Sequence, residues 1–104
     1  MEFDTKVAIE RVQSESVRAV FSIQDYRSIE PSYFDRLREA VQAAILFFQN
    51  ERTVPTALIE ELKGSAQIIR NEAIVFEGRV VACNEMAAWL DEACRKLESK
   101  SHGR

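Results

Sequence analysis

The feature that most constrains how this chain can fold is a run of apolar residues in its second half, spaced alternately three and four apart. No polar residue interrupts the run, which reads Ile59, Leu62, Ala66, Ile69, Ala73, Phe76, Val80, Cys83, Ala87, Leu90, Cys94 and Leu97. This spacing places side chains on one face of an α-helix. The chain is therefore expected to fold by packing helix against helix.

A first helix is predicted over residues 5–27, because small and apolar residues recur there at the same spacing. One face carries Ile9, Val12, Ser16, Ala19, Ile23 and Tyr26, and a second face carries Val7, Val17 and Phe21. The competing interpretation is a β-hairpin, since apolar residues also alternate from Val17 to Ile23 in a region rich in β-branched side chains. The segment between the two possible strands lacks the Gly, Asn or Pro of a tight turn, which favours the helix.

A second helix is predicted from Tyr33 to Asn50. Pro31 marks the break before it, and Ser32 with Asp35 resembles a capping box. After a short loop, Thr53 is the expected N-cap of the next helix, with Pro55 in its first turn.

The continuity of the last helix through Gly78 decides the predicted architecture. Written as heptads, the apolar run keeps its phase through Gly78, and Gly64 and Gly78 share the outermost position. We therefore predict an antiparallel bundle of three helices whose long, heptad-patterned C-terminal helix spans residues 54–97, about 65 Å. The alternatives are a four-helix bundle with a break at Gly78, and a β-hairpin over residues 73–82.

A straight last helix would leave an apolar surface without a neighbour. The second helix, about 27 Å long, could cover only its first half. Large exposed apolar surface implies a partner, so a homodimer is expected. The predicted interface comprises Val80, Cys83, Ala87, Leu90, Cys94 and Leu97 on the main face, and Ile68, Val75, Gly78, Val81 and Trp89 on a second stripe.

Length, charge and composition narrow the class of protein. The 104 residues suit one helical domain, residues 1–98, followed by a polar, frayed tail at 99–104. The net charge is −3 and no basic stripe is present, which argues against a nucleic-acid partner. No apolar run approaches the roughly 20 residues of a membrane span, and the acidic N-terminus resembles no signal peptide, so a cytoplasmic protein is expected. Cys83 and Cys94 are about three helical turns apart, too far for a disulfide, and are expected to be buried thiols.

No pattern in the sequence predicts a catalytic, cofactor-binding or metal site. The only histidine, His102, lies in the tail, no Cys-x-x-Cys occurs, and three glycines form no phosphate loop. Trp89 is the residue best suited to anchor an interface, and Arg36, Arg38 and Arg52 could contact an acidic partner. We therefore expect a non-enzymatic protein without cofactors.

The expected function is protein–protein interaction. We expect a homodimeric small regulator that binds and sequesters or escorts a partner protein, of the antiactivator, chaperone or immunity type. The reasons are the excess apolar surface of the last helix and the lack of a catalytic or cofactor motif in the sequence. The alternative is a bundle that binds a small apolar ligand in a pocket between helices. The aromatic residues available for such a pocket are Phe34, Phe47, Phe48, Phe76 and Trp89.

Overall fold

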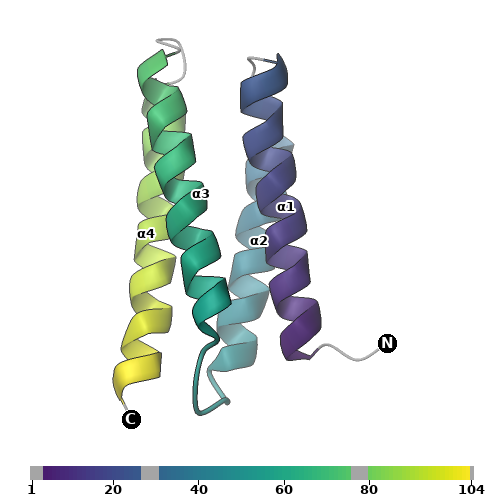
Figure 1. Cartoon of the computed structure of the whole chain (residues 1–104), viewed down its shortest axis with the longest axis vertical. Coiled ribbons are helices and arrows are strands. Elements are labelled where there is room, and N and C mark those ends of the chain that lie inside the picture. Colours follow the sequence, from purple (N-terminus) through teal and green to yellow (C-terminus); the bar gives the residue numbers. More distant parts are fainter. Residues whose placement is uncertain (1–3, 27–30, 76–79, 104) are drawn as a thin grey trace.

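The protein is a bundle of helices in a computed structural model that describes residues 4–26, 31–75 and 80–103 (Figure 1). Within these ranges there are four helices and no strand: α1 (Thr5–Tyr26), α2 (Pro31–Phe48), α3 (Thr56–Val75) and α4 (Val80–Gly103). The predicted all-helical fold is confirmed. The β-hairpin considered for residues 5–27 is excluded, because residues up to Tyr26 form α1.

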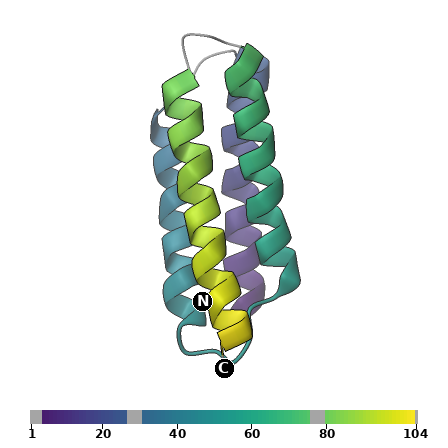
Figure 2. The ribbon, with the colours of Figure 1, turned by 90° about the vertical axis from the view of Figure 1, so that its left-hand side faces the viewer.

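The predicted continuous helix over residues 54–97 is wrong. The chain forms two helices there, and α3 and α4 lie side by side in opposite directions (Figures 1 and 2). A heptad phase can persist through a reversal because both arms of a helical hairpin turn their apolar faces toward the same core. Residues 76–79 lie outside the described residues, and Gly78 and the predictions made for it lie there with them.

The four helices pack as two antiparallel hairpins, α1–α2 and α3–α4 (Figure 2). The most extensive helix contact is α3 with α4, followed by α1 with α2. The hairpins meet where α1 packs on α3 and, less extensively, where α2 packs on α4. In the described ranges, the diagonal pairs α1–α4 and α2–α3 do not approach each other closely.

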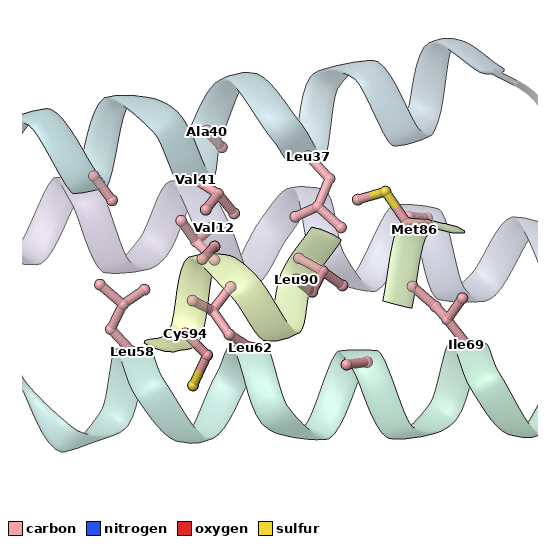
Figure 3. Close-up of a cluster of buried hydrophobic side chains, with 14 of the residues drawn as sticks. Val12, Leu37, Ala40, Val41, Leu58, Leu62, Ile69, Met86, Leu90 and Cys94 are labelled. Atoms are coloured by element: carbon pink, nitrogen blue, oxygen red, sulfur yellow. The ribbon is translucent and has the colours of Figure 1, made fainter. Parts of the chain in front are cut away.

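One apolar core lies between all four helices (Figure 3). Its fully buried side chains include Val12 of α1, Leu37 of α2, Leu62 and Ile69 of α3, and Leu90 of α4. Burial of a side chain of this size stabilises a fold by about 1.5–3 kcal/mol. The second half of the apolar run is therefore satisfied within the chain itself.

The start of α3 differs from its prediction. The helix begins at Thr56, and the Pro55 carbonyl accepts hydrogen bonds from the backbone N–H groups of Leu58 at 3.1 Å and Ile59 at 3.5 Å. Pro55 thus occupies the position before the first turn, and the predicted N-cap at Thr53 is wrong. The side chain of Val54, just before the helix, is buried in the core.

At the start of α1 the structure has an N-cap that was not predicted, and at the start of α2 the predicted capping box is absent. Asp4 caps α1, since its carboxylate accepts a hydrogen bond from the Val7 N–H at 2.9 Å. The helix α2 begins at Pro31, a residue suited to a first helical position. Ser32 therefore lies inside α2, and Asp35 pairs instead with Arg38 at 3.1 Å.

The last helix extends to Gly103, so residues 99–103 of the predicted tail continue α4. None of the described helices combines the length and the apolar character that crossing a membrane requires.

Candidate partner-binding surface

Five of the predicted interface residues lie in the chain's own core. Cys83, Ala87, Leu90, Cys94 and Leu97 are all buried, between α4 and its neighbours α2 and α3. The expected uncovered stripe on the last helix is therefore wrong. These five side chains offer no surface to a partner in this structure.

The remaining predicted interface residues differ in their exposure. Ile68, Val80 and Val81 are exposed, whereas Trp89 is half-buried. The Arg38 guanidinium lies 6.0 Å from the centre of the Trp89 ring, so this ring bridges α4 to α2. The Val75 side chain and Gly78 lie outside the described residues.

An exposed apolar surface bordered by two hollows runs along α1. Val17 and Phe21, one helical turn apart, are 61% and 53% exposed. We call this pair the α1 ridge. A hollow lies on each side of it, one toward α2 and one toward α3, and both ridge residues line both hollows.

The hollow between α1 and α2 is basic at its rim. Its volume is about 340 Å³, and its lining residues are Val17, Arg18, Phe21, Ser22, Tyr33 and Arg36. The Ser22 hydroxyl is satisfied within α1, because it donates to the Ala19 carbonyl at 2.9 Å. Arg18 and Arg36 form no ion pair with any residue that the structure describes. This hollow thus combines apolar and aromatic walls with two positive charges that no described residue pairs.

The hollow between α1 and α3 is more apolar and acidic at its rim. Its volume is about 220 Å³, and it is lined by Ser16, Val17, Val20, Phe21, Glu61, Ser65 and Ile68. Two buried hydroxyls, Ser16 and Ser65, hydrogen-bond each other between the helices. The Ser65 hydroxyl also donates to the Glu61 carboxylate at 3.4 Å. Glu61 is the one charged residue of this lining.

A second exposed apolar area lies at the edge between α2 and α4 and contains fewer exposed apolar residues. Leu46 is 62% exposed and lines a hollow of about 290 Å³ with Gln42, Ile45 and Lys96. Leu46 is the one large hydrophobic residue of that lining that is exposed. A single exposed apolar residue is normal on a protein surface. The α1 ridge is therefore the better candidate.

The edge between α3 and α4 is closed by charge pairs instead. Lys63 contacts Glu98 at 2.7 Å, and Arg70 contacts Asp91 at 2.8 Å. The hydrogen bond and the charge of Glu98 raise the pKa of Lys63. Because the folded pKa exceeds the unfolded one, this stabilisation is present at neutral pH and is lost as the pH rises through the folded pKa.

The two cysteines are free and buried, as predicted. Burial raises the pKa of the Cys94 thiol, and its Sγ–H donates to the Ile59 carbonyl at 3.8 Å. A protonated, buried thiol is a poor nucleophile. Among the described side chains, no three His, Cys, Asp or Glu residues gather where they could hold a metal ion.

The aromatic residues suggested for a ligand pocket do not surround a common hollow in the described part of the chain. Phe34 and Phe48 are buried in the core, and the Phe47 ring meets that of Phe48 edge-on at 5.0 Å. Trp89 lies apart at the α4 edge, and Phe76 is outside the described residues. A ligand pocket among them stays a prediction.

Comparison with protein-family models, curated proteins and solved structures finds no match to this chain. Its candidate function therefore rests on its own residues.

Sequence reasoning placed Val17 and Phe21 on a second face of the first helix but did not connect them with a site. Their separation of four residues, away from the buried face, was the available signal. The grouping with Arg18, Arg36 and Glu61 depends on which helices flank α1. That information is tertiary, so no local pattern carries it.

Proposed function

We propose that this protein is a non-enzymatic, cytoplasmic protein–protein interaction module, a small regulator that binds and sequesters or escorts a partner protein. The α1 ridge with its two hollows is the observation that carries the proposal. Val17 and Phe21 project from the bundle, and Ile68 extends the apolar surface onto α3. Exposed apolar surface of this kind, flanked by charged residues, is typical of interaction sites.

The composition of the surface favours a protein partner. Aromatic side chains and arginine are enriched in protein interfaces, where they supply much of the binding energy. Phe21, Tyr33 and Arg18 meet around one hollow. A projecting ridge between two hollows also suits a neighbouring helix, because helix packing fits ridges into grooves.

The proposal is tested by comparing three immobilised forms of the protein in extracts of its source cells. Phe21→Asp places a charge on the ridge, and Leu46→Asp makes the same change at an equally exposed residue of α2. We expect a protein that wild type and Leu46→Asp both retain and Phe21→Asp loses by at least about tenfold, since buried anchors contribute 2 kcal/mol or more.

Circular dichroism and urea unfolding must show that both variants remain folded. Identical sets of retained proteins for all three forms would contradict the proposal, because the ridge would then make no contribution to binding.

A further inference from the structure

The two hollows beside the α1 ridge carry opposite charges. Arg18 and Arg36 border the hollow toward α2, and Glu61 borders the hollow toward α3. An apolar ridge with a basic rim on one side and an acidic rim on the other is complementary to itself. Two copies can satisfy both rims at once if each acidic rim meets the other copy's basic rim.

We propose that a second copy of this chain covers the ridge, in a two-fold symmetric dimer with the two α1 helices side by side and parallel. This inference rests on the proposed function, because it takes the α1 ridge as a protein-binding surface and names a second copy as the chain that covers it when no other partner is bound. When the two-fold axis runs parallel to α1, the α2 side and the α3 side of the ridge are exchanged in the facing copy. The α3 flank of one copy, with Glu61, therefore lies opposite the α2 flank of the other, with Arg18 and Arg36.

The antiparallel arrangement is disfavoured by the same charges. A two-fold axis perpendicular to α1, in the plane of the interface, brings α3 against α3 and α2 against α2. The arginines of one copy would then meet the arginines of the other. The two Glu61 residues, one turn before the level of Ser16 and Ser65, would lie about 21 Å apart along the helix axis and would pair with nothing. Like charges opposed across an interface cost affinity. The parallel dimer sets Glu10 against its counterpart at an exposed position two turns before the ridge, whereas the antiparallel dimer gathers the arginines of both copies beside the ridge, so the parallel dimer is favoured.

The ridge itself packs in the hollow toward α3. Two parallel ridges cannot occupy the two-fold axis together, so each is displaced to one side of it. The symmetry makes the two contacts equivalent, and each ridge therefore enters the corresponding hollow of the other copy. The hollow toward α3 has the apolar walls Val20 and Ile68, whereas charged guanidinium groups border the other. Phe21 of each copy thus enters the α1–α3 hollow of the other, and the charged rims meet outside it.

This arrangement can be tested by reversing the charge of the basic rim and the charge of the acidic rim in separate variants. One variant carries Arg18→Glu and Arg36→Glu, and the other carries Glu61→Arg. Light scattering and sedimentation equilibrium measure the dimer dissociation constant of each. We expect a wild-type dimer, a dissociation constant at least about tenfold higher for each variant alone, and recovery when the two variants are mixed. Arg52→Glu, a charge reversal in the connection between α2 and α3, is the control and should leave the dimer unchanged.

The direction of the helices is tested with Glu10→Cys, an exposed position two turns before Val17. In the parallel dimer the two introduced cysteines face each other, and mild oxidation should join the chains. In an antiparallel dimer centred on the ridge they would be about 27 Å apart and would not react. The native thiols are buried and do not compete.

A wild-type protein that stays monomeric at its highest soluble concentration would overturn this inference. So would variants that dimerise as well as wild type, or a Glu10→Cys dimer that does not cross-link. The proposed function would survive any of these results if Phe21→Asp still loses a different protein that wild type retains. The two failures are therefore distinguishable.

Discussion

The contact of α3 with α4 and the contact of α3 with α1 differ in the residues at their centre and at their exposed edge. Toward α4, apolar residues such as Ile69 and Leu90 are buried, and the ion pairs Lys63–Glu98 and Arg70–Asp91 lie at the edge. Toward α1, the helices meet through the buried hydroxyls of Ser16 and Ser65.

The edge of the α1–α3 contact is also left apolar, with Val17, Phe21 and Ile68 exposed. Charged side chains at an edge are stable in contact with water, whereas covering exposed apolar side chains with a partner lowers the free energy. The difference fits the proposal that the α3–α4 contact holds the chain together while the α1–α3 edge binds another protein.

The largest expected effect is that of Leu90→Ala. Leu90 is fully buried in the core, so truncation should lower the free energy of unfolding by about 2–5 kcal/mol, measured by urea titration. Leu46→Ala, an equally large truncation at an exposed site, should stay within about 0.5 kcal/mol of wild type. If Leu90→Ala only dissociates an oligomer and leaves the stability of the monomer intact, the intramolecular assignment of this helix face is wrong.

Ser16→Ala should lower the free energy of unfolding by about 1–2 kcal/mol, because the Ser65 hydroxyl keeps only its long contact with Glu61. Replacing both serines by alanine removes donor and acceptor together, and should cost no more than the single change. Ser22→Ala is the matched control, since that hydroxyl bonds only within its own helix. An additive loss in the double variant would show that the two hydroxyls do not depend on each other.

Gly64→Ala should stabilise the protein by up to about 1 kcal/mol, because glycine weakens a helix interior. A methyl group added at Gly64 meets no heavy atom within 4 Å, so no clash offsets the gain. Thermal unfolding followed by circular dichroism measures the change. A lower melting temperature would mean that another chain approaches α3 at this point.

The smallest expected effect is that of Asp91→Asn. It removes the partly exposed pair with Arg70 and should cost about 0.5 kcal/mol or less. Raising the salt concentration to about 1 M should abolish most of that difference, because the Debye length falls to about 3 Å. Glu85→Gln, at an exposed carboxylate with no ion pair among the described residues, is the control and should change nothing in either condition.

The apolar spacing of three and four was sufficient to predict the helical class and most of the core. Leu62, Ile69, Cys83 and Leu90 are buried, as their positions in the run require. The spacing could not show that the run folds back on itself. Both arms of a helical hairpin turn apolar faces toward the same core, so the spacing can continue from one arm to the next, and a pattern of faces does not reveal a turn.

The candidate site was less accessible to sequence reasoning than the fold. The interface was predicted on α4 because half of a straight helix would have been uncovered, and that premise fails once α4 packs on α3. Arg36 was noted as a possible contact for an acidic partner, but only the packing of α2 beside α1 brings it next to Phe21. Sites assembled from three helices leave little trace in any one of them.

The pairing of Ser16 with Ser65 also bears on how the chain folds. Both hairpins join helices that are neighbours in sequence, and contacts between near neighbours form early because closing a short loop costs little entropy. Ser16 and Ser65 are separated by 49 residues and meet only when the two hairpins dock. We expect this docking to be the late step, so the edge that presents the α1 ridge is completed last as the protein folds.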